Sequence, residues 1–322
     1  MRAPPPAGDT TSRRPPQRLY PFTSHYLEVR GLRMHYLDEG PRDAPPVLML
    51  HGNPTWSFYY RNLVLALRDR FRCIVPDYIG CGLSDKPDAA AYDFRLASRI
   101  EDLASLMDHL GLDRPVSLVL HDWGGMIGCA WAVANPDRVE RLVILNTAAF
   151  PLPEDKRMPP ALSLVRNTAF GAFLVTRFNA FSAIAARVAF KKPVSREIRK
   201  AYTLPYDSPA HRLATLRFVQ DIPLAETDPG FDILINTAEH LHWLADKPCL
   251  VAWGERDFVF DAPFLKKWQA YFPRAEIHRF PDCGHYVLED GGPALIETIG
   301  RFIGIREDSH DGHASGTSLE RG

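Results

Sequence analysis

The chain has 322 residues, 46% of them hydrophobic, and a formal net charge of -1. This length and apolar content suit one large α/β domain or a domain with a sizeable insertion. The balanced charge argues against nucleic acid as a partner. No apolar run approaches the ~20 residues that span a bilayer, and residues 1–18 lack the apolar segment of a secretory signal.

The cysteines are scattered and odd in number, with none of the spacings typical of metal ligands: Cys73, Cys81, Cys129, Cys249 and Cys283. A reduced, cytoplasmic protein is the simplest explanation. No motif implies a metal ion or an organic cofactor.

The first part of the chain predicts strands that alternate with helices. Residues 1–19 are rich in proline and predict a disordered segment. Residues 26–29 and 32–37 then predict a hairpin. Further strands are predicted at 46–50, 71–75, 116–120 and 139–145, with helices at 57–68, at 94–110 and directly after residue 122. This pattern predicts an α/β fold with a mostly parallel sheet and helices on both faces.

The alternation stops after residue 146, where only helical segments follow. Residues 161–190 are nearly free of acidic side chains and rich in phenylalanine, which predicts a helical cap above an apolar cavity. Strands return at 248–253 and 275–280, and helices at 263–271 and 295–302. The predicted organisation is a core of residues 20–149 and 245–305, a cap of residues 150–244 and a flexible tail of residues 306–322.

Asp122 lies where a buried strand turns into a helix without a loop. Such a joint is the nucleophile elbow, usually written Gly-x-Ser-x-Gly. Here Asp122 replaces the serine, Gly124 fills the second glycine position, and Leu120 stands at the first. The N–H groups at the start of the helix favour an ionised carboxylate. The alternative is that Asp122 serves only as the N-cap of that helix.

Two more residues follow predicted strands in the order that a catalytic triad requires. Asp257 follows the strand at 248–253, and His285 follows the strand at 275–280. The order nucleophile, acid, histidine is that of α/β-hydrolases. Asp261 competes for the role of the acid, but it lies farther from the strand end and has the position of an N-cap.

An aspartate nucleophile changes the expected chemistry. A carboxylate needs no base to activate it, so His285 is free for other work, such as activating water. Attack on a saturated carbon gives an ester and expels a group that must be held. Asn53 and Trp123 offer an amide and an indole N–H for that group, and the backbone N–H of Asn53 and the Trp123 N–H suit an oxyanion site. The alternative for Trp123 is packing, and His51 is expected to be structural.

At these residues the chain resembles the α/β-hydrolase superfamily, over nearly all of residues 27–303. More narrowly, the segments 51–56 and 121–125 are similar to haloalkane dehalogenases. This resemblance implies that Asn53 and Trp123 bind a departing halide, that Asp122 is alkylated, and that His285 activates the hydrolytic water. One dehalogenase subgroup carries its acid after the strand before the cap. Asn146 occupies that place here, which leaves Asp257 as the acid.

A closer resemblance is to the β-lactone decarboxylases of bacterial long-chain olefin biosynthesis. It is carried by residues 20–40, 205–208, 216–224 and 257–261. It implies conversion of a cis-3,4-dialkyl β-lactone, a long-chain apolar substrate, into a cis-alkene and carbon dioxide, in assemblies with other olefin-pathway enzymes. Asp122 would open the lactone at its alkyl carbon, and attack at the carbonyl carbon is equally admissible.

Three alternatives remain open from the sequence. A haloalkane dehalogenase shares every catalytic residue named above. An epoxide hydrolase usually needs two tyrosines in the cap, for which Tyr202 and Tyr206 are candidates. A ligand receptor without catalytic activity is expected to have lost members of the triad, whereas all three are present here.

Overall fold

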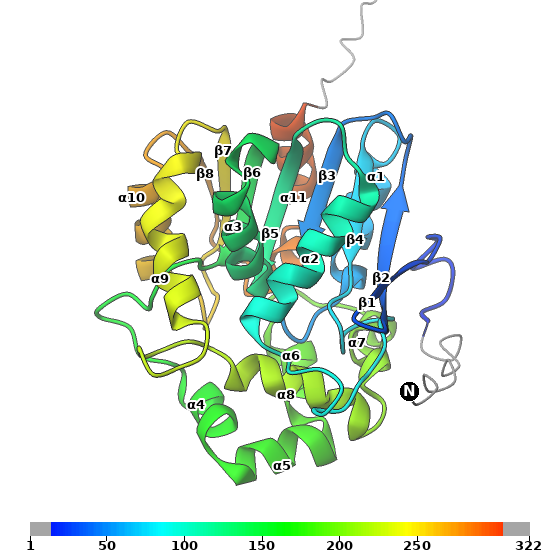
Figure 1. Ribbon diagram of the computed structural model, residues 1–322, viewed down its shortest axis with the longest axis vertical. Coiled ribbons are helices and arrows are strands. Elements are labelled where there is room, and N and C mark those ends of the chain that lie inside the picture. Colours follow the sequence, from blue (N-terminus) through cyan, green and yellow to red (C-terminus); the bar gives the residue numbers. More distant parts are fainter. Residues whose placement is uncertain (1–13, 305–322) are drawn as a thin grey trace, which may run out of the picture.

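The computed structural model describes residues 14–304, and the segment that these residues form is built around one eight-stranded sheet (Figure 1). The strand order is β1-β2-β4-β3-β5-β6-β7-β8, with antiparallel pairing of β1 with β2 and of β2 with β4, and parallel pairing elsewhere. The strands are β1 (His25–Val29), β2 (Leu32–Glu39), β3 (Pro46–Leu50), β4 (Arg72–Pro76), β5 (Val116–Asp122), β6 (Val139–Thr147), β7 (Cys249–Gly254) and β8 (Glu276–Phe280). The predicted mostly parallel α/β fold is confirmed.

Helices cover both faces of the sheet because its central strands are buried on both sides. Alternate residues of β3 belong to two different apolar clusters: Leu48 and Leu50 pack with α2 and α3, whereas Val47 and Met49 pack with α1 and α11. The core helices are α1 (Arg61–Leu67), α2 (Leu96–Leu110), α3 (Trp123–Ala134), α10 (Ala262–Tyr271) and α11 (Val287–Ile303). Alternation of this kind gives a three-layered molecule.

The chain between β6 and β7, residues 148–248, contains helices and loops but no strand. The α-helices are α4 (Pro160–Asn167), α5 (Ala169–Phe178), α6 (Ala180–Val188), α7 (Arg196–Thr203), α8 (Leu213–Gln220) and α9 (Phe231–His240). Helices α4 to α8 lie together at one end of the sheet (Figure 1). In contrast, α9 packs against α3 of the core. We therefore propose that the cap is shorter than residues 150–244 and ends before α9.

The segments expected to be loose are only partly described. Residues 14–19 of the predicted disordered segment form a turn, in which the Leu19 N–H donates to the Pro16 carbonyl at 2.9 Å. The remainder of that segment and the predicted tail of residues 306–322 lie outside the described residues. No helix within residues 14–304 is by itself long and apolar enough to cross a bilayer.

Candidate active site

Asp122 occupies a strained joint between β5 and α3. Its backbone has φ 49° and ψ -124°, a combination that residues other than glycine rarely adopt. Two glycines allow neighbouring chain segments to approach this joint closely. A Cβ atom at Gly124 would lie 2.0 Å from the Leu50 carbonyl oxygen, and one at Gly52 would lie 2.1 Å from Asp122 Oδ1. The strand-to-helix elbow expected from the sequence is therefore present.

The Asp122 carboxylate is held by two backbone N–H groups. The Asn53 N–H donates to Oδ1 at 2.7 Å, and the Trp123 N–H lies close enough to lower the pKa of the carboxyl. The side chain makes none of the capping hydrogen bonds that a simple N-cap would make to α3. The Asn53 N–H of the oxyanion site suggested by the sequence thus binds Oδ1 of the carboxylate itself, and Oδ2 is the oxygen that faces His285.

His285 bridges the two aspartates. Its Nδ1 lies 2.8 Å from Asp257 Oδ2, and its Nε2 lies 3.7 Å from Asp122 Oδ2. Asp257 is held in turn by the Val259 N–H at 2.7 Å and by the Asn146 side-chain N–H at 3.0 Å. The structure thus brings Asp122, Asp257 and His285 into one chain of contacts.

Asn146 lies beside the acid rather than apart from it. Its side-chain oxygen accepts the Gly254 N–H at 2.7 Å while its amide N–H reaches Asp257. The end of β6 and the loop after β7 therefore meet at Asp257, which in turn binds His285. The sequence marked Asn146 as a residue at a strand end, but its contact with Asp257 was not predicted.

Asp261 does not contact His285 in any hydrogen bond or ion pair of the described residues. Its Oδ2 pairs with Lys156 at 2.5 Å. It does directly precede α10, as expected, but its side chain makes no capping hydrogen bond. This geometry favours Asp257 as the acid.

Burial and neighbouring charges shift the pKa values of Asp122 and His285 in opposite directions. Burial raises the pKa of the Asp122 carboxyl, although His285 and the two backbone N–H groups oppose that rise. Burial alone would lower the pKa of His285, but the Asp257 carboxylate, its hydrogen bond and the Asp122 carboxylate together raise it. The histidine therefore holds a proton more readily than a free imidazole does.

Helix α8 of the cap positions both side-chain donors named from the sequence. The Thr215 carbonyl accepts one N–H of the Asn53 amide at 3.0 Å, which leaves the second N–H of that amide unused. Phe218 packs edge-on against the Trp123 ring with centroids 5.1 Å apart. No hydrogen bond within residues 14–304 takes the indole N–H of Trp123. Both groups thus retain an N–H for an anion.

A buried cation lies behind these donors. The Arg99 guanidinium sits 3.7 Å from the Phe218 ring centroid and 5.3 Å from that of Trp123. It pairs with Asp221 at 3.0 Å, and both side chains are buried. Arg99 was not predicted from the sequence, since only the folded chain brings α2 and α8 together.

An apolar cavity of about 390 Å³ lies between the sheet and the cap. Asn53, Asp122, Trp123 and His285 all line it, and most of its remaining wall is aliphatic or aromatic. The cap helices α4, α5 and α6 supply much of that wall. The Asp122 carboxylate therefore faces a cavity suited to an apolar ligand.

The two cap tyrosines considered for an epoxide site lie elsewhere. Neither Tyr202 nor Tyr206 lines the cavity. The Tyr202 hydroxyl donates to Glu289 at 2.5 Å, and the Tyr206 hydroxyl donates to the Thr55 carbonyl at 3.3 Å. Their assignment as a pair that holds an epoxide oxygen is wrong, because both hydroxyls are committed to structural contacts.

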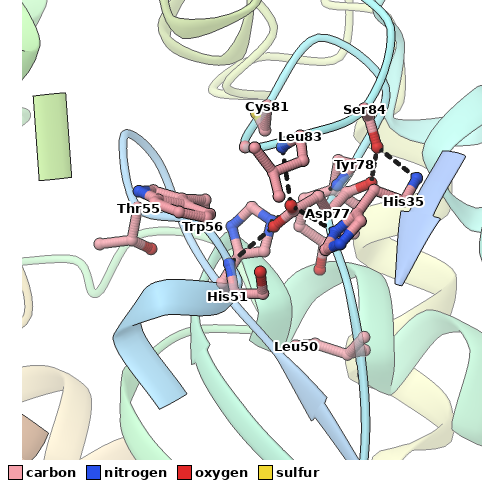
Figure 2. Close-up of polar contacts among 12 residues, drawn as sticks. His35, Leu50, His51, Thr55, Trp56, Asp77, Tyr78, Cys81, Leu83 and Ser84 are labelled. Atoms are coloured by element: carbon pink, nitrogen blue, oxygen red, sulfur yellow. Dashed lines mark hydrogen bonds and ion pairs between the residues drawn. The ribbon is translucent and has the colours of Figure 1, made fainter. Parts of the chain in front are cut away.

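The loop that carries Asn53 rests on a buried network around Asp77 (Figure 2). The carboxylate accepts the Ser57 N–H at 2.7 Å, the Leu83 N–H at 2.8 Å and the His35 Nδ1 proton at 2.8 Å. His51 Nε2 lies 3.9 Å from it. His51 is therefore a support of the loop, as the sequence suggested, and is absent from the cavity wall.

The fold and the site define an α/β-hydrolase that carries a buried carboxylate, Asp122, at the elbow position. No group of three or more potential ligands within residues 14–304 could hold a metal ion. The chain belongs to the alpha/beta hydrolase fold family, whose model matches residues 45–292.

Similar proteins fall into two groups. The chain is 52% identical over 286 residues to the cis-3-alkyl-4-alkyloxetan-2-one decarboxylase of Shewanella oneidensis, covering 88% of this chain and 89% of that protein. It is 36% identical over 292 residues to a haloalkane dehalogenase of Mycolicibacterium paratuberculosis, covering 87% and 92%. A crystal structure of a haloalkane dehalogenase mutant from Agrobacterium tumefaciens matches with a TM-score of 0.79 at 25% identity, covering 90% and 99%.

Proposed function

We propose that this protein is a β-lactone decarboxylase that converts cis-3,4-dialkyl oxetan-2-ones into cis-alkenes and carbon dioxide. The observation that carries the proposal is the 52% identity to a decarboxylase of that substrate class, against 36% to a dehalogenase at similar coverage. The apolar cavity above Asp122 supports it, because two alkyl chains need such a wall.

In the first step, Asp122 Oδ2 attacks the saturated ring carbon that bears an alkyl chain and is bonded to the ring oxygen. The new carbon–oxygen bond forms an ester, the ring carbon–oxygen bond breaks, and its electron pair leaves as a carboxylate. The second N–H of Asn53 and the indole N–H of Trp123 bind that carboxylate. The backbone N–H of Asn53 keeps its hydrogen bond to Oδ1, the carbonyl oxygen of the ester.

In the second step, the released carboxylate leaves as carbon dioxide. Its bond to the neighbouring carbon breaks, that electron pair becomes the double bond, and the ester oxygen departs with its own pair to restore Asp122. Inversion in the first step followed by anti elimination gives the cis-alkene. Attack at the carbonyl carbon, with an anhydride as the intermediate, remains the other admissible first step.

His285 has a different task from the one that a dehalogenase gives it. The elimination frees Asp122 without water, so His285 need not activate a nucleophile. Its pKa is raised by the two aspartates, and we propose that the imidazole fixes the Asp122 carboxylate in place through the 3.7 Å contact. Asp257 and Asn146 orient the ring.

The experiment supplies the purified chain with a synthetic cis-3,4-dialkyl oxetan-2-one in ¹⁸O-labelled water. The proposal predicts cis-alkene and carbon dioxide in equal amounts, with no ¹⁸O in the peptide that contains Asp122 after many turnovers. Formation of a 3-hydroxy acid with ¹⁸O in that peptide would mean that the ester is hydrolysed, and would overturn the proposal.

The second candidate is a haloalkane dehalogenase, favoured by the pair of N–H donors that also suits a halide. Halide release from a long-chain bromoalkane measures it under the same conditions. The decarboxylase proposal predicts a kcat/KM for the bromoalkane far below that for the lactone. The reverse order would identify the dehalogenase.

Two finer points belong to the same proposal. We propose that the protein works in the cytoplasm, since its five cysteines are free thiols. We also propose that it acts beside other enzymes of an olefin pathway, which the resemblance of the sequence implies. Co-purification of the tagged chain from a native host tests the second point.

A further inference from the structure

The outer face of the cap carries large apolar side chains that are exposed to solvent. The cap patch, as we name it, consists of side chains that are 40–64% exposed: Leu164, Phe170, Phe173, Phe178, Ile184 and Val188. Phe173 and Phe178 contact each other with ring centroids 5.5 Å apart. Figure 1 shows α5 at the outermost edge of the molecule, away from the sheet. Patches of this kind mark interaction sites.

The chain segment that carries this patch is rich in basic residues. Residues 156–196 contain eight Lys or Arg and no Asp or Glu, although the whole chain has a net charge of -1. Arg177 on α5 and Arg187 on α6 are both exposed, and neither forms an ion pair with any described residue. Lys156 and Arg166 are paired with Asp261 and Asp228, whereas Arg177 and Arg187 present unpaired positive charge beside exposed phenylalanines.

The cap patch is continuous with the cavity of the site. Leu164, Ile184 and Val188 are exposed to solvent and also line the cavity wall. The cavity therefore opens at the patch, and an apolar molecule that leaves it there meets apolar surface first. Helices α5 and α6 meet at an angle of 77°, and neither can span a bilayer alone.

We propose that the cap patch docks onto an anionic membrane surface, with the α5–α6 corner inserted at the level of the lipid headgroups. Short helices with exposed phenylalanines and flanking arginines bind in this way, because apolar side chains enter the boundary of the acyl chains while cations meet anionic lipids. A protein partner would not require a continuous 41-residue stretch free of acidic residues. In combination with the proposed function, the contact lets long-chain substrate and product pass directly between cavity and lipid.

The test measures sedimentation of the full chain with vesicles that contain phosphatidylglycerol and with vesicles of phosphatidylcholine alone. The wild type binds the anionic vesicles, and added salt weakens that binding. The triple variant Phe170→Ser/Phe173→Ser/Phe178→Ser and the double variant Arg177→Glu/Arg187→Glu each bind about tenfold more weakly or worse. None of these five side chains lines the cavity, so turnover of a water-dispersed short-chain substrate stays unchanged.

Matched controls separate this contact from nonspecific apolar and electrostatic binding. Trp243→Ser removes an aromatic side chain that is 51% exposed outside the cap patch. Arg114→Glu/Lys266→Glu makes the same charge change at exposed positions outside the cap. Both controls bind like the wild type. Unchanged binding by the cap variants, or equal binding to both kinds of vesicle, overturns the proposal.

A third outcome also overturns it. If the wild type does not bind vesicles but self-associates, and the triple variant does not self-associate, the cap patch is an interface between copies of the chain. Because vesicle binding is measured without substrate, its failure is distinct from failure of the proposed function.

Discussion

The His285 Nε2 lies 3.7 Å from Asp122 Oδ2 while its Nδ1 lies 2.8 Å from Asp257 Oδ2. The imidazole is therefore anchored to Asp257 and only approaches Asp122. This asymmetry suits a histidine that positions a carboxylate, since a strong hydrogen bond to Oδ2 would compete with attack on carbon.

Replacing the acid should lower the pKa of His285. In Asp257→Asn the carboxylate that raises it is gone, so burial, which lowers the pKa, prevails. Titration of the His285 ring by NMR measures the change. Asp261→Asn serves as the control and should leave the titration unmoved, because Asp261 pairs with Lys156 instead.

Asp257→Asn should also change how the free energy of unfolding depends on pH. The folded-state pKa of His285 lies above its unfolded value, so its ion pair with Asp257 stabilises the protein fully below about 6.5. That contribution disappears as the pH rises through the folded-state pKa. Urea unfolding at several pH values should therefore show that the stability difference between wild type and Asp257→Asn shrinks with rising pH. A difference that grows with pH would contradict the assignment.

Trp123→Phe should lower kcat/KM by about a hundredfold, the usual effect of one lost oxyanion donor. The phenyl ring keeps much of the packing against Phe218 but has no N–H for the expelled carboxylate. Steady-state kinetics with the lactone measures the effect. The control is Trp253→Phe, which removes a buried indole N–H that has no hydrogen-bond partner among the described residues and does not line the cavity. Equal losses in both variants would show that Trp123 acts through packing.

Asp77→Asn should destabilise the fold by about 3–5 kcal/mol, as expected when one partner of a buried charged network is removed. Burial alone would raise the pKa of Asp77, but His35 and the surrounding donors lower it to about 2. The stabilisation is therefore present above the unfolded-state value of 3.8 and is lost as the pH falls through about 2.

Urea unfolding at neutral pH measures the effect of Asp77→Asn. The matched control is Asp85→Asn, which breaks a half-exposed pair with Arg33 and should cost about 1 kcal/mol or less. If the two variants unfold at the same urea concentration, the network in Figure 2 does not stabilise the loop of Asn53.

Much of the fold follows from local patterns in the sequence. The strand at 46–50 was predicted with its observed ends, because a short apolar run bounded by proline and a His-Gly turn leaves little freedom. The predicted helix at 57–68 is instead a 3-10 turn at Ser57–Tyr60 followed by α1. Three consecutive aromatic residues in that turn are buried, and tertiary packing outweighs helix propensity there.

The site was partly predictable for a related reason. Asp122, Asp257 and His285 follow strands, and the carboxyl ends of parallel strands meet at one edge of a sheet. Contacts that depend on the cap could not be predicted from the sequence in the same way. The contact of the Thr215 carbonyl with Asn53 and that of the Arg99 guanidinium with Trp123 depend on the position of α8. No local pattern in the sequence specifies that position.

The central claim is that the Asp122 carboxylate bonds to carbon, and the variant Asp122→Asn tests it most directly. An amide is nearly isosteric but has no anionic oxygen, so alkene formation from a cis-3,4-dialkyl oxetan-2-one should fall by about a thousandfold or more. Mass spectrometry of the protein after the assay checks that the introduced amide has not deamidated, and circular dichroism checks that the fold is intact. An intact Asp122→Asn protein that forms alkene at the wild-type rate would contradict the account.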